Sequence, residues 1–217
     1  MVLDLSHGKR VYDWLGLHKR VYRGIRWSVC FGREEYLQER AVAALALKQG
    51  DSVLDLACGA GVNLPYLFDK VGPSGKIVAV DYSGGMLATA RATATVKGWS
   101  NVEFHQEDAA HIDLPAASFD GALCTFGLSA MPGEVAALGR AAVGLKPGAR
   151  FVILDAKMFT GLARVFNPIA GPIFKYTTNW DYEKDVLRSI RGALGEITLN
   201  EYNSGSTFIA VGTKRLD

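Results

Sequence analysis

The sequence is poor in the residues that mark several large protein classes. Its three cysteines, Cys30, Cys58 and Cys124, show no CxxC spacing, and its four histidines show no metal-ligand spacing, so we expect neither a disulfide framework nor a metal site. No apolar run approaches the roughly 20 residues of a membrane span, and the start of the chain, with Asp4, lacks the apolar core of a signal peptide. We therefore expect a cytoplasmic protein, with peripheral membrane contact left open.

The overall composition of the chain is typical of one folded globular domain. The chain has 217 residues, of which 49% are hydrophobic and 21% charged, and its formal net charge is +2. At this length a full hydrophobic core forms without metal or disulfide support. The small net charge disfavours a nucleic-acid partner, and nothing in the composition indicates the oligomeric state.

The positive charge is concentrated near the start. Residues 1–33 hold seven Lys and Arg against two acids. Apolar residues recur at helical spacing through this stretch, at Val11, Leu15, Tyr22, Ile25 and Val29. We predict that residues 1–32 form a basic amphipathic helical region. Three interpretations stay open: a lid over a ligand, contact with an anionic membrane surface through residues 9–30, or plain packing with a solvated charged face.

From residue 33 to residue 217 the sequence predicts a second, larger unit with an open α/β fold. Helices are expected at 33–48, 62–70, 86–97 and 132–145, and strands at 52–58, 76–81, 102–107, 119–125 and 150–155. Ser83 is available to cap the helix at 86–97. Such alternation indicates a doubly wound, mostly parallel sheet. Residues 196–202 and 207–214 are joined by too short a link for a crossover, so they predict an antiparallel C-terminal hairpin.

A nucleoside pocket is predicted where the first strand ends. That strand runs into a loop with Gly59 and Gly61, which lets a ligand lie against the backbone at the start of a helix. Asp81 ends the next strand, where a carboxylate accepts hydrogen bonds from ribose hydroxyls, and Asp108 follows the third strand. Leu64 breaks the GxGxxG dinucleotide fingerprint, and no GxxxxGK[ST] phosphate loop is present.

Five segments resemble, in order and spacing, the successive motifs of class I S-adenosylmethionine-dependent methyltransferases. They read VLDLACGAGVNLPYL, IVAVDYSGGMLATAR, VEFHQEDAAHIDLP, FDGALCTFGLSAMP and LKPGARFVILD. The resemblance is close over residues 50–156 and is strongest to the group that holds quinone-biosynthesis methyltransferases and bacterial phosphatidylethanolamine N-methyltransferases. It implies a Rossmann-like sheet of seven strands, the last antiparallel, and S-adenosyl-L-methionine as cofactor.

The resemblance also implies which residues surround that cofactor. They are Asp55, Ala57, Gly59, Gly61 and Asn63 at the methionine part, Asp81 at the ribose, Tyr82 and Met86 at the adenine face, Asp108 and Ala109 at its edge, and Thr125, Phe126 and Leu128 at the floor where cofactor and acceptor meet. Ala57 departs from the family pattern, because many members have glycine there.

Catalysis is expected to depend mainly on positioning, because the sulfonium of the cofactor already activates its methyl group. His111 is a candidate general base for an acceptor whose proton must leave. Tyr22, together with Tyr12, is expected to close over the cofactor if the basic region is a lid. The alternative for each is an ordinary loop or packing residue.

The acceptor is predicted to be hydrophobic. Residues 157–180 form a cap segment of apolar and aromatic residues interrupted by Pro168 and Pro172, which predicts neither a regular strand nor a long helix. Such a cap suits a small or lipidic acceptor, for instance a phospholipid amine, a quinone or a secondary metabolite. The alternative function is a non-catalytic, nucleoside-binding regulator or partner subunit.

Overall fold

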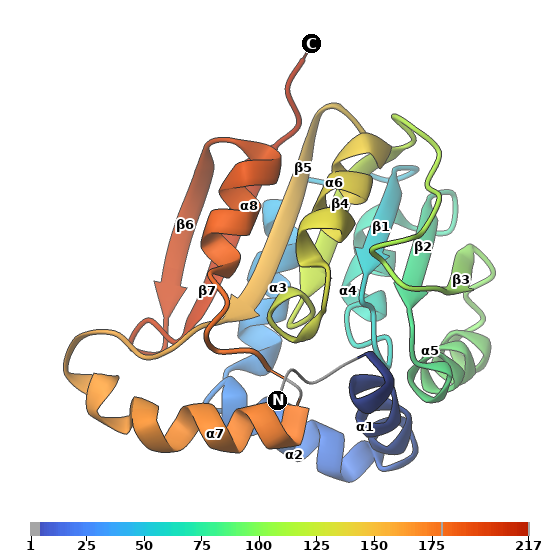
Figure 1. The fold of residues 1–217 in the computed structure, drawn as a ribbon. Helices are drawn as coiled ribbons and strands as arrows, with labels where there is room; N and C mark the ends of the chain where they lie inside the picture. The colour runs from blue at the N-terminus through green and yellow to red at the C-terminus, as the bar shows by residue number, and fades with distance from the viewer. Residues whose placement is uncertain (1–4, 179, 217) are drawn as a thin grey trace.

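The computed structural model describes residues 5–178 and 180–216, which form a seven-stranded sheet with helices on both faces (Figure 1). The strands are β1 (Ser52–Leu56), β2 (Lys76–Asp81), β3 (Val102–Gln106), β4 (Phe119–Thr125), β5 (Leu145–Ala156), β6 (Ile197–Tyr202) and β7 (Thr207–Thr213). Their order is β3-β2-β1-β4-β5-β7-β6. Strands β1 to β5 are parallel, and β7 is antiparallel to both β5 and β6. The predicted fold class and C-terminal hairpin are confirmed.

Helices bury both faces of the sheet. Those on one face are α3 (Glu34–Ala44), α4 (Leu64–Val71) and α5 (Gly84–Lys97), and those on the other are α6 (Glu134–Gly144) and α8 (Val186–Leu194). Side chains of successive strand residues point to opposite faces of the sheet. In β5, Val152 packs on the α3–α5 side, whereas Phe151 and Ile153 pack on the α6–α8 side. Because neither face meets water, the central strands read as continuous apolar runs.

Helix α5 begins where the sequence predicts it. The Ser83 hydroxyl accepts a hydrogen bond from the Met86 N–H at 3.2 Å, which caps the helix as expected. Gly98 ends the helix in the left-handed conformation, with φ +70°. These two caps fix the first residues of α5 beside the end of β2.

The basic N-terminal region forms two helices where one continuous pattern was read. Helix α1 (Leu5–Leu17) and helix α2 (Lys19–Val29) are separated at His18, whose backbone is not helical. The Trp14 carbonyl accepts a hydrogen bond from the His18 ring at 2.8 Å, and the two rings stack 4.0 Å apart. A side chain that competes for a backbone carbonyl favours the end of a helix. Figure 1 shows α1 and α2 lying across the carboxyl ends of the strands.

The cap segment contains a longer helix than expected. A 3₁₀ turn, η2 (Gly161–Phe166), leads into α7 (Asn167–Thr178), which runs through Pro172. Pro168 lies in the first turn of α7, where a backbone N–H has no helical partner. The missing N–H of proline therefore destabilises the helix little at this position. Pro172 removes one hydrogen bond, and the exposed position of the helix lets water satisfy the carbonyl it frees. The prediction that this segment holds no long helix was wrong.

No helix among the described residues is both long and apolar enough to cross a membrane. The chain from 5 to 178 and from 180 to 216 also holds no group of three or more His, Cys, Asp or Glu arranged to bind a metal. Cys30, Cys58 and Cys124 are buried free thiols. Burial raises the pKa of Cys30 to about 12, so this thiol stays protonated at neutral pH.

Candidate active site

Asp81 holds the centre of the site at the end of β2. Its Oδ2 accepts a hydrogen bond from the Gly59 N–H at 2.8 Å, and its Oδ1 accepts one from the Ser83 N–H at 2.9 Å. Burial raises its pKa to about 6, and these two bonds oppose that rise. A carboxylate accepts about four hydrogen bonds, so each oxygen keeps capacity for a ligand hydroxyl. The geometry suits the predicted ribose.

Gly59 and Gly61, in the loop after β1, are required for different structural reasons. Gly59 has φ +53°, and a Cβ added to it would lie 3.2 Å from the Tyr22 hydroxyl, so a side chain would fill the cavity here. A Cβ on Gly61 would instead meet Ala90 of α5 at 2.9 Å, so Gly61 permits the loop to pack on that helix. Ala57 has φ +55°, a conformation that glycine adopts more readily.

A polar network lies beneath the loop. The Asn63 side-chain amide donates to Asp55 Oδ1 at 3.0 Å and to Thr125 Oγ1 at 2.9 Å. Asp55 Oδ2 and Asn63 Oδ1 are buried and have no hydrogen-bond partner among the described residues. Burial raises the pKa of Asp55 to about 7, against the opposing bond from Asn63. The two hydrogen bonds of the Asn63 amide join the ends of β1 and β4 beneath the loop, so the network supports the loop from behind.

Two adjoining cavities open at this edge of the sheet. The smaller, about 60 Å³, lies against the ends of β1 to β4. The larger, about 390 Å³, lies between α2 and the cap segment, with Ile25, Trp27, Met158 and Trp180 among its walls. The residues common to both cavities are Tyr12, Tyr22, Phe126 and Ala130. These four side chains therefore form the boundary between the two cavities.

The structure brings most of the predicted cofactor residues to the smaller cavity. Those that line it are Ala57, Gly59, Asp81, Tyr82, Asp108, Ala109, Thr125 and Phe126. Those that do not are Asp55, Gly61, Asn63, Met86 and Leu128, all of which are buried behind it or have their side chains occupied in support of it. Met86 and Leu128 in particular are fully buried core residues. These five residues shape the cavity without forming its wall.

Tyr12 of α1 and Tyr22 of α2 lie at the junction of the cavities. The Tyr12 ring packs edge to face on Tyr82, with centroids 6.2 Å apart, and the Arg26 guanidinium lies 4.8 Å from the centre of the Tyr22 ring. Burial raises the pKa of Tyr22 to about 12 and also raises that of Tyr12. At neutral pH both phenols keep their protons. Tyr22 can therefore donate a hydrogen bond but cannot serve as a base.

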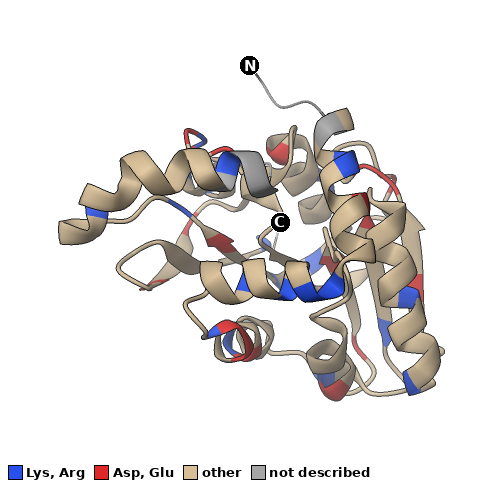
Figure 2. Ribbon diagram, turned by 90° about the horizontal axis from the view of Figure 1, so that it is seen from below, with Lys and Arg blue, Asp and Glu red and all other residues tan. Residues whose placement is uncertain are grey.

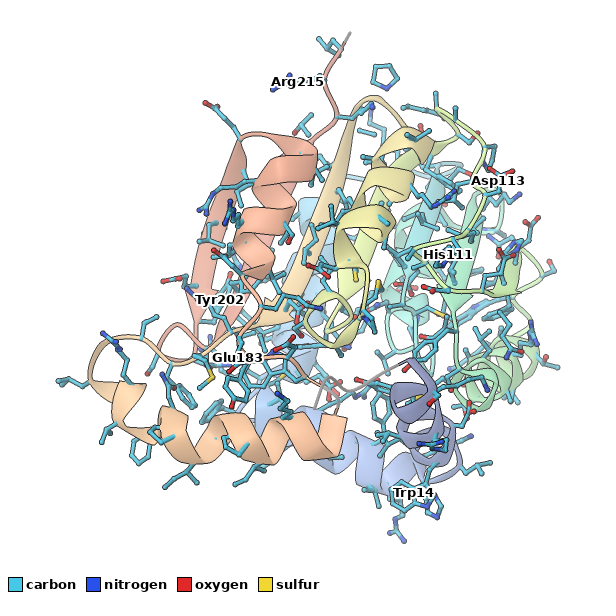
Figure 3. All side chains as sticks on the ribbon, viewed as in Figure 1. Trp14, His111, Asp113, Glu183, Tyr202 and Arg215 are labelled. Atoms are coloured by element: carbon cyan, nitrogen blue, oxygen red, sulfur yellow. The ribbon has the colours of Figure 1, made fainter. Side chains whose placement is uncertain are left out.

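His111 is not brought to either cavity. About 80% of its side chain is exposed, and its Nδ1 lies 2.9 Å from Asp108 Oδ2 (Figure 3). It follows Asp108 in a tight turn, in which the Asp108 carboxylate accepts the Ala110 N–H. The ring is directed to solvent by this turn, so the geometry does not support the predicted role as general base.

Asp13 is a residue of the site that the sequence reasoning missed. Its Oδ1 accepts hydrogen bonds from the Ser83 hydroxyl at 2.7 Å and the Gly85 N–H at 3.1 Å, and its Oδ2 accepts one from Lys9 at 2.8 Å. Partial burial acts to raise the pKa of Asp13, but these three bonds together lower it below its usual value. Asp13 thus ties α1 to the start of α5, next to Asp81. Asp13 is the only acid between residues 9 and 33, but nothing in that stretch indicates its contact with Ser83 and Gly85.

Glycines allow α1 to approach α5 closely. A Cβ on Gly16 would lie 2.5 Å from the Gly85 carbonyl carbon. A Cβ on Gly85 would lie 2.7 Å from the backbone carbonyl oxygen of Asp13. No side chain fits at either position without moving the helices apart. The Thr89 hydroxyl adds a hydrogen bond to the Gly16 carbonyl at 3.0 Å. The contact between α1 and α5 therefore holds the N-terminal region against the site.

Asp155, at the end of β5, supports the other side of the larger cavity. It is fully buried and accepts hydrogen bonds from the Ser129 hydroxyl at 2.6 Å and the Ser129 N–H at 3.0 Å. These bonds hold the short turn η1 (Leu128–Ala130), which presents Ala130 to both cavities. Burial raises the pKa of Asp155, opposed by the same bonds.

The chain is similar in sequence and in fold to known methyltransferases. The methyltransferase domain family matches residues 47–183. The chloroplastic 2-phytyl-1,4-beta-naphthoquinone methyltransferase of Arabidopsis thaliana is 31% identical over 138 residues, 62% of this chain and 53% of that protein. A 2-phytyl-1,4-naphtoquinone methyltransferase of Synechococcus elongatus is 33% identical over 157 residues, 69% of this chain and 65% of that protein. The chain spans about half the length of the first curated relatives it matches.

Among solved structures, a SAM-dependent methyltransferase from Aquifex aeolicus superposes with a TM-score of 0.63 at 24% identity, covering 82% of this chain and 89% of that one. That likeness concerns the fold alone. Together with the family match over most of the sheet and with the carboxylate and glycine loop at its edge, it leads to one assignment. The chain belongs to the class I S-adenosylmethionine-dependent methyltransferase family, in the neighbourhood of the quinone-biosynthesis group.

Proposed function

We propose that this protein transfers a methyl group from S-adenosyl-L-methionine to a hydrophobic, quinone-like acceptor held in the larger cavity. The observation that carries the proposal is the junction of the two cavities at Tyr12, Tyr22, Phe126 and Ala130. A transfer reaction needs donor and acceptor sites that share a boundary. The names of the relatives, which refer to naphthoquinone and menaquinone methyltransferases, support the same acceptor class.

The smaller cavity is the proposed cofactor site. Asp81 is suited to accept the ribose hydroxyls, Tyr82 to face the adenine, and Asp108 and Ala109 to lie at its edge. When bound, the cofactor supplies an electrophilic methyl group on a sulfonium.

The chain's own contribution to catalysis is proposed to be alignment. The apolar walls of the larger cavity exclude water, and the four shared side chains fix the approach of the acceptor to the donor. Such positioning is worth about 7 to 11 kcal/mol in favourable cases. Tyr22 is proposed to orient an acceptor oxygen by donating its phenolic proton in a hydrogen bond, which its raised pKa keeps available.

Residues 1–32 are proposed to act as a lid on the domain formed by residues 33–217. With α1 and α2 seated, the smaller cavity of about 60 Å³ is far below the roughly 300 to 1,000 Å³ of small-molecule sites. Because Tyr12 of α1 and Tyr22 of α2 line this cavity, these two helices are proposed to move when a nucleoside enters. The Asp13 contacts with Ser83 and Gly85 are the bonds that would open and close.

The proposal is tested with labelled S-adenosylmethionine and a set of reduced quinones that differ only in tail length, with a water-soluble amine as comparison. We expect label in the quinone products, with KM falling as the tail lengthens. Asp81→Asn should lose transfer, and Asp69→Asn, an exposed acid on α4, should retain it. Cofactor binding without transfer to any acceptor would favour the alternative of a non-catalytic nucleoside-binding regulator.

A further inference from the structure

We propose that the protein docks on an anionic lipid bilayer through a face made of α2 and the η2–α7 segment. We call this the docking face and define it as residues 19–29 and 161–178, without the side chains of Phe174 and residues 176–178. In Figure 1 these elements lie along the same side of the molecule, beyond the carboxyl ends of the strands. From the sequence, membrane contact is left open for residues 9–30 alone; the η2–α7 segment is the new and longer part of the face.

The first observation is a stripe of large apolar side chains that the fold leaves in solvent. Leu162 is 98% exposed, Val165 71%, Phe166 60% and Ile169 66%. Their spacing of three or four residues places them along one side of the segment. Single exposed apolar residues are ordinary, but a contiguous stripe marks an interaction surface. The packing of η2–α7 on the body does not require it, because Ala170 and the buried Gly171 lie on the inner side.

The second observation is the charge around the stripe. Residues 156–180 contain Lys157, Arg164 and Lys175 and no acid, and residues 14–33 contain five Lys and Arg and no acid. Lys157 is paired with Glu201 and Arg26 with Glu34, so the charge offered to a partner comes from the other basic residues of these two stretches. Figure 2, which views the molecule from this side, shows basic residues along α2. The net charge of the whole chain is only +2, so the basic residues are concentrated here. Basic residues beside an apolar stripe complement anionic headgroups above acyl chains.

The third observation concerns aromatic side chains on the neighbouring helices. Trp14 of α1 and Trp27 of α2 are exposed, and Figure 3 shows Trp14 on the side of α1 that faces away from the sheet. Phe31, also exposed, packs edge to face on Phe159 at 6.0 Å and so joins the end of α2 to the start of the cap segment. Amphipathic aromatic rings favour the boundary between headgroups and acyl chains.

The docking face also encloses the larger cavity. Ile25 and Trp27 of α2 form one wall, and Met158, Phe159 and Ala170 form another. A bilayer seated on this face would deliver a lipid-dissolved acceptor between α2 and α7 without passage through water. This step rests on the proposed function, whereas docking itself does not. No described helix is able to span a bilayer, so the contact is peripheral.

The test is co-sedimentation of the full chain, without cofactor, with vesicles of phosphatidylcholine alone or of phosphatidylcholine mixed with phosphatidylglycerol. We expect binding to the mixed vesicles only, and weakening by added salt. Leu162→Ser/Phe166→Ser should weaken the partition coefficient about tenfold or more, because two inserted side chains are lost. Lys19→Gln/Arg23→Gln should lose the preference for phosphatidylglycerol. The matched control is Val96→Ser/Val143→Ser, which changes two exposed apolar residues on α5 and α6 and should leave binding unchanged.

Three results would overturn the proposal. The first is no binding of the unaltered chain to mixed vesicles. The second is equal binding by the stripe variant and its control. The third is a dimer in light scattering that only the stripe variant loses, which would assign the stripe to a second copy of the chain.

Methyl transfer to a water-soluble short-tailed quinol is measured alongside. Its retention by the stripe variant separates loss of docking from damage to the site, and its absence in the unaltered chain would count against the proposed function alone.

Discussion

At the scale of single residues, Asp81 is the side chain on which cofactor binding should depend most. Asp81→Asn is expected to raise the Kd for S-adenosylmethionine about 10- to 100-fold, since hydrogen bonds to a charged group contribute about 1.5 to 3 kcal/mol each. Isothermal titration calorimetry measures this directly. Asp69→Asn is the control, and melting curves should show that both variants fold. An unchanged Kd in Asp81→Asn would mean that the ribose is held elsewhere.

Asp81 should also make cofactor binding depend on pH. Burial raises its pKa to about 6 in the free protein, so the carboxylate becomes protonated as pH falls below that value and loses acceptor capacity. The Kd is therefore expected to be constant near pH 8 and to rise below about pH 6. In Asp81→Asn this rise should be absent. A wild-type Kd that stays flat down to about pH 5 would contradict the assignment.

The two catalytic candidates from the sequence should behave differently. His111→Ala is expected to change kcat by less than about twofold, because the exposed ring lines neither cavity. Tyr22→Phe should lower kcat/KM by about tenfold through loss of one hydrogen bond, without moving the pH profile, since the phenol does not titrate near neutrality. A pH profile that shifts in Tyr22→Phe, or a large loss in His111→Ala, would restore base catalysis by that residue.

At the scale of elements, the contact of α1 with α5 controls the proposed lid. Gly16→Ala is expected to unseat α1, because its Cβ would meet the Gly85 backbone at 2.5 Å. Limited proteolysis within residues 1–30 should become faster, and kcat/KM should fall as Tyr12 and Tyr22 leave the junction. The control is Gly24→Ala on α2, whose Cβ meets nothing within 4 Å. That variant should be unchanged or more stable by up to about 1 kcal/mol.

Predictability from sequence differed between elements for identifiable reasons. Strand β1, the glycine loop and the cap of α5 depend on neighbours in the chain, so apolar runs, Gly59 and Ser83 indicated them correctly. The break at His18 depends on a side chain bonding to the Trp14 carbonyl, which helical periodicity does not register. Helix α7 was missed because proline was taken to stop it, although an exposed helix tolerates the loss of one hydrogen bond.

The site was predictable to the extent that it lies on strand ends. Asp81, Tyr82 and Asp108 follow parallel strands, whose carboxyl ends meet at one edge in this architecture. The contact of Asp13 with Ser83 joins residues 70 positions apart, and no local pattern encodes it. Nor does any local pattern reveal that Met86 faces the core while Ala130, on a short turn held by Asp155, reaches both cavities.

At the scale of the whole molecule, buried carboxyls should couple stability to pH. Burial raises the pKa of Asp55 from 3.8 to about 7 and that of Asp81 from 3.8 to about 6. The native protein then binds more protons than the unfolded chain between these values, so their contribution to the free energy of unfolding falls as pH rises from about 4 to about 7. Asp55→Asn should reduce this fall by on the order of 2 kcal/mol, measured by urea unfolding at about pH 5 and about pH 8. An equally steep fall in the variant would show that Asp55 is ionised at both pH values.

The position of β7 in the sheet determines when, during synthesis, the sheet can be completed. This strand lies between β5 and β6, although residues 157–206 separate it from β5 along the chain. While the ribosome adds that stretch, the outer edge of β5 has no partner strand. An open edge of this kind pairs readily with other extended polypeptides. The nascent protein is therefore most exposed to aggregation while residues 157–206 are being added, after β1 to β5 have been made.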